Sequence, residues 1–299
     1  MREISFCIQI TKVNYIRTRR RVVGTRLSKS SSSIDVLKPT TWGGFWDIFG
    51  EVLVDLLDVQ EGQRVFDVGT GGGSVLYPLA RKVGASGCVI GVETCDHCVG
   101  KTSAEIQRCQ ISNAVVQCVD ARETEFEACS FDCVTAGFIG WDNYFDFQTL
   151  EYKKPDDLME AICRLLKPGG KFGMSSWLLQ EDLDWMFEFL SARSIESKRH
   201  YHPETAEGWT KILSLAGFQD IRVYTRQASF TYADLDVWWK EMMDYEWPLT
   251  GTNKDVITDS IKAAAFESIQ GRLTEGGGVP FRREAIFATA IRQDNTPHS

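Results

Sequence analysis

The amino-acid sequence predicts an α/β protein with a doubly wound, mostly parallel sheet and helices on both of its faces. Three observations predict this fold. Short apolar runs alternate with helical stripes, a glycine-rich turn follows the first of these runs, and acidic residues stand at the ends of successive runs. Strands that are buried on both faces are almost continuously apolar, and helical crossovers between them make neighbouring strands parallel.

The expected elements follow one another in a regular order. An amphipathic helix is expected first, because apolar residues recur every three or four positions over 42–57. Short apolar runs predict strands over 64–68, 88–92, 114–119, 131–136, 171–177, 220–224 and 285–291. The remaining helices are expected over 75–82, 98–109, 156–166, 179–191, 202–216, 233–246 and 253–273.

Charge divides the chain into two parts. The first 40 residues contain nine Lys or Arg and two acids, whereas the rest contains 24 basic and 39 acidic residues. We therefore expect residues 1–34 to be a basic extension outside the fold, either disordered or a mitochondrial transit peptide. Residues 35–299 are expected to form one domain, with a helical insertion at about 228–280 that caps it.

The composition excludes several classes of protein. A net charge of −8 argues against nucleic acid as a partner, and no apolar run is long enough for a membrane span. Nine irregularly spaced cysteines indicate a reducing compartment, so a soluble, cytoplasmic protein is expected. No metal site is expected, because Cys95 and Cys129 belong at opposite edges of the predicted sheet.

The most informative motif is the segment 67–73, Asp-Val-Gly-Thr-Gly-Gly-Gly, which leaves a strand and enters a helix. Parallel sheets bind ligands at this edge, and glycines let a ligand lie against the backbone. Asp67, Glu93 and Asp120 are expected to share the edge, where Glu93 can accept hydrogen bonds from ribose hydroxyls and Asp120 from an exocyclic amine. Acids without a phosphate-loop lysine suit a cationic or neutral adenosine ligand. Alternatively, each acid caps a helix.

These motifs resemble those of class I S-adenosylmethionine-dependent methyltransferases. The small-molecule branch that includes the ubiquinone and menaquinone biosynthesis methyltransferases is the most similar. The matching segments are 65–73, Gly91-Val92-Glu93, Val119-Asp120-Ala121, Ala136-Gly137 and Leu166-Lys167-Pro168-Gly169-Gly170-Lys171. The resemblance is good over about 42–177 and weak beyond. One departure is Cys95-Asp96-His97-Cys98, where relatives more often carry Ser and Met.

The resemblance implies a seven-stranded sheet whose last strand is antiparallel, and S-adenosylmethionine as cofactor. The residues implied to contact the cofactor are Asp67, Gly69, Thr70, Gly71, Gly73, Glu93, Thr94, Asp120, Ala121 and Gly137. The glycines would lie under its methionine part, Glu93 would bind the ribose and Asp120 the adenine. Gly137 and Phe138 would lie close to the sulfonium.

The acceptor is expected to be a small molecule. Trp238 and Trp239 lie on a helix of the insertion, which suggests the hypothesis that this helix caps an apolar or aromatic acceptor. Candidate bases are His200, His202, Asp142 and Tyr144. In-line positioning alone can suffice for methyl transfer, so no catalytic residue is assigned. A homodimer is one expectation for the assembly.

Two other functions stay open at the level of sequence. One is a Rossmann-type NAD(P)-dependent oxidoreductase, against which Ser74 replaces the third glycine of the dinucleotide motif. The other is a non-catalytic protein that binds an adenosine ligand, because cofactor residues report binding and not turnover.

Overall fold

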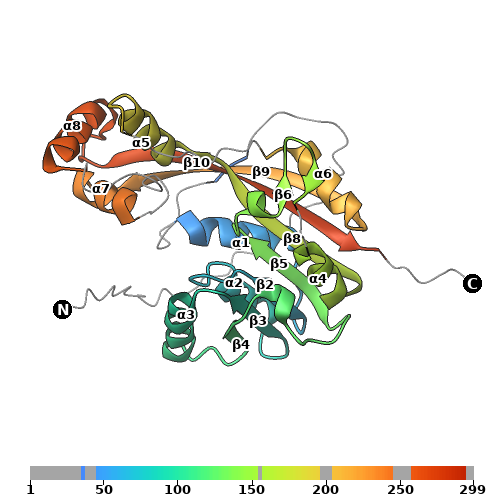
Figure 1. Cartoon of the computed structure of the whole chain (residues 1–299). Coiled ribbons are helices and arrows are strands. Elements are labelled where there is room, and N and C mark those ends of the chain that lie inside the picture. The colour runs from blue at the N-terminus through green and yellow to red at the C-terminus, as the bar shows by residue number, and fades with distance from the viewer. Residues whose placement is uncertain (1–34, 38–44, 154–156, 196–203, 245–256, 294–299) are drawn as a thin grey trace, which may run out of the picture. The chain divides into compact units, whose positions relative to one another are not determined.

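The computed structural model describes residues 35–37, 45–153, 157–195, 204–244 and 257–293 (Figure 1). Residues 35–299 form one compact unit. Its main sheet has the strand order β1-β9-β10-β8-β5-β2-β3-β4. The expectations for residues 1–34 and for the two candidate histidines, His200 and His202, lie outside the described residues.

The half of the sheet that carries the glycine loop is parallel, as the sequence predicted. Its strands are β2 (Arg64–Val68), β3 (Cys88–Glu93), β4 (Ala114–Cys118) and β5 (Phe131–Gly137). The helices that precede or connect them are α1 (Phe45–Leu57), α2 (Leu76–Val83) and α3 (Asp96–Arg108). Strand β2 pairs with β3 on one side and β5 on the other, so the carboxyl ends of these strands share one edge.

Three long strands complete the sheet. They are β8 (Leu166–Gln180), β9 (Phe218–Tyr232) and β10 (Val279–Arg292). Strand β10 is antiparallel to both β8 and β9, which confirms the seven-stranded sheet with an antiparallel last strand. A short strand, β1 (Asp35–Leu37), adds a parallel partner beside β9. The helical insertion was expected to begin at about residue 228. In the structure, residues 228–232 still belong to β9 and pair with β10, so the helices begin later.

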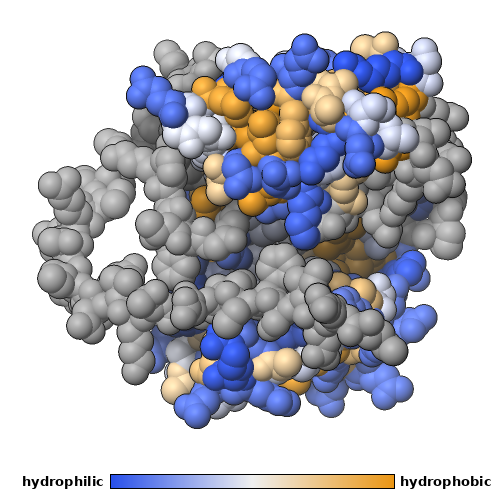
Figure 2. All heavy atoms as spheres, turned by 90° about the vertical axis from the view of Figure 1, so that its left-hand side faces the viewer, coloured by the Kyte–Doolittle hydropathy of each residue, from blue (hydrophilic) through white to orange (hydrophobic). Residues whose placement is uncertain are grey.

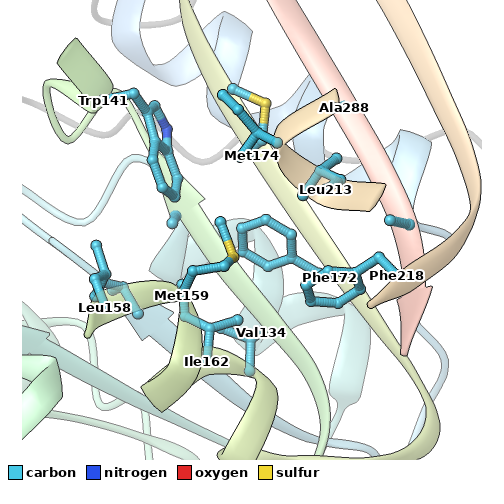
Figure 3. Close-up of a cluster of buried hydrophobic side chains, with 14 of the residues drawn as sticks. Val134, Trp141, Leu158, Met159, Ile162, Phe172, Met174, Leu213, Phe218 and Ala288 are labelled. Atoms are coloured by element: carbon cyan, nitrogen blue, oxygen red, sulfur yellow. The ribbon is translucent and has the colours of Figure 1, made fainter. Parts of the chain in front are cut away.

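Different helices cover the two faces of the sheet. On one face, α1 and α2 pack through residues such as Phe49, Leu53 and Leu79. On the other face, α4 (Leu158–Leu165) and α6 (Ala206–Leu215) pack against β5, β8 and β10, as the cluster around Phe172 shows (Figure 3). A small hairpin of β6 (Phe145–Asp146) and β7 (Glu151–Tyr152) precedes α4.

A helical lobe packs on the far ends of the long strands. It consists of α5 (Glu181–Ser191), α7 (Leu235–Asp244) and α8 (Asp259–Ile269), grouped beside β9 and β10 at the upper left of Figure 1. The lobe has its own apolar core, which includes Met186, Trp238 and Phe281. Figure 2 faces the lobe and shows hydrophobic side chains bordered by hydrophilic ones on its surface.

A buried ion pair lies where the lobe joins the sheet. Arg283 of β10 and Asp182 of α5 are each 1% exposed, and the Arg283 Nη2 lies 2.5 Å from the Asp182 Oδ2. The Tyr232 hydroxyl donates to the same carboxylate oxygen. Charges buried at this depth need a partner, and here each charge is the partner of the other. The pair therefore connects α5, the first helix of the lobe, to β10, the last strand.

Candidate functional site

The glycine loop between β2 and α2 has the geometry that the sequence predicted. Gly69, Gly71 and Gly73 all have positive φ angles, of 68°, 52° and 87°. A Cβ at Gly69 would lie 2.5 Å from Ile139, so only glycine fits there, whereas a Cβ at Gly72 would meet nothing within 4 Å. The loop therefore packs tightly at its base and presents open backbone at its tip, as a ligand cradle requires.

Asp67 lies beneath the loop with a buried carboxylate. It accepts hydrogen bonds from the hydroxyls of Thr70, at 2.9 Å, and Thr135, at 2.7 Å. Burial raises the pKa of Asp67 to about 6; the two hydroxyl donors oppose this shift, and the negative charge of Glu93 adds to it. These contacts show Asp67 and Thr70 fixing the start of the loop, and their direct contact with a cofactor stays a prediction.

Glu93 at the end of β3 reaches the glycine loop. Its Oε2 accepts the backbone N–H of Gly71 at 3.0 Å. Its Oε1 accepts the N–H groups of Thr94, at 2.8 Å, and Cys95, at 3.0 Å. The carbonyl oxygen of Gly71 in turn accepts the hydroxyl of Thr102, on α3, at 2.7 Å. The structure thus brings the predicted loop and the predicted ribose acid together.

Asp120 follows β4 at the carboxyl edge of the sheet, as predicted, and it also caps the helix that follows. It precedes a short 3-10 helix (Ala121–Glu123), and its Oδ1 accepts the Arg122 N–H at 2.9 Å. The Arg122 guanidinium also pairs with it, at 2.7 Å from the Oδ2, and these hydrogen bonds lower the pKa of Asp120. Ala121 is buried beside it. The helix-cap alternative therefore holds for Asp120, while its contact with adenine stays a prediction.

Gly137 ends β5 beside a group of rings that we call the aromatic cluster: Trp46, Phe49, Phe138 and Trp177. Phe138 stacks on Trp177, with 4.2 Å between ring centroids, and meets Trp46 edge-on at 5.3 Å. Phe138 has a φ of 54°, and its N–H donates to the Ser175 carbonyl oxygen at 2.8 Å. Because β5 is parallel to β2, the residues that follow β5 lie at the same edge of the sheet as the glycine loop, and the cluster lies there too.

One candidate residue, Glu204, was missed by the sequence analysis. Its carboxylate accepts the Ser176 hydroxyl at 2.6 Å and the Trp209 indole N–H at 2.9 Å. Burial raises the pKa of Glu204 to about 7, and the charge of Asp142 adds to this shift. The only local signal is its place before Thr205, the N-cap of α6.

Trp238 and Trp239 lie within the helical lobe. Trp238 is fully buried against Trp185 and Phe281, and Trp239 is 8% exposed beside Phe266. Both rings therefore belong to the core of the lobe, and the hypothesis that they contact an acceptor gains no support from their positions.

None of the helices that the structure describes is long and apolar enough to cross a membrane. Likewise, the described residues contain no group of three His, Cys, Asp or Glu side chains arranged to hold a metal ion.

Comparison with known proteins agrees with this site. A model of the methyltransferase domain family matches residues 59–243, and the chain belongs to this family. It is 32% identical to nocamycin O-methyltransferase of Saccharothrix syringae over 123 residues, and the aligned segment covers 41% of each chain. It is 31% identical over 143 residues to the ubiquinone/menaquinone biosynthesis C-methyltransferase UbiE of Cellvibrio japonicus, or 47% of this chain and 53% of that one. The chain thus spans about half the length of these relatives.

Solved structures show the same fold. The YcgJ protein of Bacillus subtilis aligns over 83% of this chain and all of its own, with a TM-score of 0.54 and 18% identity. Family membership confirms the class that the glycine loop and the Pro-Gly-Gly motif indicated, and with it S-adenosylmethionine as the cofactor of this class.

Proposed function

We propose that this chain transfers the methyl group of S-adenosylmethionine to a small-molecule acceptor. The observation that carries the proposal is the hydrogen bond between the Glu93 carboxylate and the Gly71 N–H, which joins the ribose acid to an open glycine loop. A nicotinamide enzyme is disfavoured, because Ser74 stands where the dinucleotide motif needs its third glycine and the family match is to methyltransferases.

The residues present fit this cofactor. The open backbone at Gly72 leaves room for the methionine part, and the Oε2 of Glu93 retains one lone pair for a ribose hydroxyl. The rings of the aromatic cluster suit a sulfonium cation, which aromatic faces attract. When bound, S-adenosylmethionine supplies an electrophilic methyl group.

The residues of this chain contribute alignment and exclusion of water. The glycine loop and Glu93 orient the donor, while Phe138 and Trp177 form an apolar wall at the end of β5, beside β8. Holding two reactants in line can supply much of the barrier reduction, on the order of 7–11 kcal/mol in favourable cases. No charged residue is required for that contribution.

The aromatic cluster supports an acceptor that is apolar or aromatic. The curated relatives are named for nocamycin O-methylation and for ubiquinone and menaquinone biosynthesis, which supports a small organic acceptor over a macromolecule. From the sequence alone, we also propose a homodimer and a cytoplasmic location. The location would be mitochondrial if residues 1–34 act as a transit peptide.

Incubation of the full chain with methyl-labelled S-adenosylmethionine and a panel of phenols, naphthols, amines and carboxylic acids tests the function. We expect label in a product from the aromatic acceptors, and much less label with Glu93→Gln. S-adenosylhomocysteine binding without label in any product would favour the non-catalytic alternative.

A further inference from the structure

A partly buried carboxyl group lies just before α6 in an unusual setting. Thr205 caps this helix, since its hydroxyl accepts the Gly208 N–H at 2.9 Å. Glu204 is therefore the residue before the cap, and Trp209 is on the first turn, where a hydrophobic pair often fixes the entry of the chain. Here the pair is polar, because the Trp209 indole N–H donates to Glu204.

Both oxygens of Glu204 have a neutral donor. The Oε1 accepts from Ser176 and the Oε2 from Trp209. Neither donor neutralises the negative charge, and among the described residues no Lys or Arg forms an ion pair with this carboxylate. Each oxygen keeps a second lone pair that can accept a proton donor from a ligand.

The position of Ser176 places Glu204 at the methyl-transfer edge. In the pairing of β5 with β8, Gly137 lies opposite Ser175, the residue before Ser176. The next residue, Trp177, stacks on Phe138. Successive residues of a strand face opposite sides, so Trp177 and Glu204 lie on opposite sides of β8, just past the point where its neighbour β5 ends. A planar acceptor lying against β8 past the end of β5 would meet a ring on one side and a carboxylate on the other.

We propose that the Glu204 carboxylate binds the hydroxyl group of an aromatic acceptor and takes its proton during methylation. The inference rests on the proposed function and adds the base and the chemical class of the acceptor. As the oxygen forms its bond to the methyl carbon, the carbon–sulfur bond breaks and its electron pair stays on sulfur. The O–H bond breaks, its electron pair stays on oxygen, and the proton passes to Glu204 and then to solvent.

The charges around Glu204 also select against other acceptors. Asp142, in the 3-10 helix Trp141–Asn143, adds negative charge, and Lys153 donates to the carbonyl oxygen of Asp142. A carboxylate or phosphate on the acceptor would be repelled by Glu204 and Asp142, whereas a hydroxyl would gain a charge-assisted hydrogen bond.

Binding of 1-naphthol and 1-methoxynaphthalene to the full chain, with S-adenosylhomocysteine present, tests this role without turnover. We expect the wild type to prefer 1-naphthol, and Glu204→Gln to lose about tenfold in 1-naphthol affinity, the value of a charge-assisted hydrogen bond. Affinities for 1-methoxynaphthalene and S-adenosylhomocysteine should not change. Glu207→Gln, an exposed position on the first turn of the same helix, is the matched control.

The pH dependence separates this role from a structural one. Because the ionised carboxylate accepts the hydroxyl more strongly than the neutral carboxyl group does, 1-naphthol affinity should fall as the pH drops through about 7, the pKa of Glu204. The Ser176 hydrogen bond lowers that pKa, so Ser176→Ala should move the midpoint to higher pH, and Glu204→Gln should abolish it.

Three results would overturn the proposal. They are an equal preference for 1-naphthol over 1-methoxynaphthalene in wild type and Glu204→Gln, no binding of either probe, and a pH midpoint of 1-naphthol affinity that does not move in Ser176→Ala. Failure of S-adenosylhomocysteine to bind wild type would instead overturn the proposed function, so the two failures are distinguishable.

Discussion

The Glu93 carboxylate accepts the Gly71 N–H at 3.0 Å, and this hydrogen bond ties the end of β3 to the tip of the glycine loop. The same side chain accepts two further N–H groups, from Thr94 and Cys95, at the start of α3. One carboxylate therefore organises two backbone segments that would face the ribose. Its loss should disturb the loop as well as remove a ligand for the hydroxyls.

The buried Asp67 should make stability depend on pH. Its pKa is about 6 in the folded protein, above the value of about 4 in an unfolded chain, so the folded state keeps the proton longer. The free energy of unfolding should therefore fall as the pH rises from about 4 to 6, by about 3 kcal/mol at most, and then level off.

Urea unfolding of wild type and Asp67→Asn between pH 4 and 8 measures this effect. The difference between the two proteins isolates Asp67, because the similar contribution of Glu204 is present in both. A difference that does not vary over this range would contradict the account.

Trp239 should matter for stability and not for the cofactor. Trp239→Ala removes a buried ring that packs on Phe266, and should cost about 3–5 kcal/mol of unfolding free energy. S-adenosylhomocysteine affinity should change less than twofold. Val237→Ala, 39% exposed on the same helix, should be nearly neutral. Calorimetric titration gives the affinity and urea unfolding gives the stability. A loss of S-adenosylhomocysteine affinity in Trp239→Ala without a loss of stability would contradict a purely structural role for this ring.

The buried ion pair gives a prediction for the lobe. Arg283→Met leaves Asp182 charged and buried, which should cost about 3–5 kcal/mol, while Asp182→Leu with Arg283→Met should recover most of the loss. Arg222→Ala, in an exposed pair with Asp220, should cost less than about 1 kcal/mol. Chemical unfolding measures the free energy of all three variants. A smaller loss in Arg283→Met than in Arg222→Ala would contradict this prediction.

Cys95 should be the most reactive thiol near the loop. It is exposed, and hydrogen bonds from Cys98 lower its pKa while the pKa of Cys98 rises to about 11. Iodoacetamide at neutral pH should modify Cys95 before Cys98, and before Cys109, which is also exposed but has a raised pKa.

A peptide mass spectrometry time course follows this order directly. S-adenosylhomocysteine should slow the reaction at Cys95. The Cys95 N–H donates to Glu93, so a ribose bound to Glu93 would lie close to this thiol. Equal rates at Cys95 and Cys109 would show that the hydrogen bonds from Cys98 do not activate this thiol.

The sequence predicted the parallel half of the sheet well, because its signals are local. The run 64–68 and the glycines after it set the strand, the turn and the loop within ten residues of one another. The lengths of β9 and β10 were missed, since they depend on pairing between Tyr232 and Val279 across an intervening pair of helices.

The same distinction separates the site residues. Glu93 could be predicted because it closes a strand at a regular spacing from the loop. Glu204 could not, because its environment comes from Ser176, 28 residues earlier, and from the fold that brings them together. The cap made by Asp120 was foreseen as an alternative, whereas its pairing with the Arg122 guanidinium was not.

Calorimetric titration of the full chain with S-adenosylhomocysteine, and with NAD in parallel, tests the central claim most directly. Glu93→Gln is the variant, and Glu105→Gln, an exposed acid on α3 paired with Arg108, is the control. We predict micromolar binding of S-adenosylhomocysteine alone, weakened at least tenfold in Glu93→Gln, about 1.4 kcal/mol, and unchanged in Glu105→Gln. Binding of NAD in its place, or equal affinity in wild type and Glu93→Gln, would contradict the account.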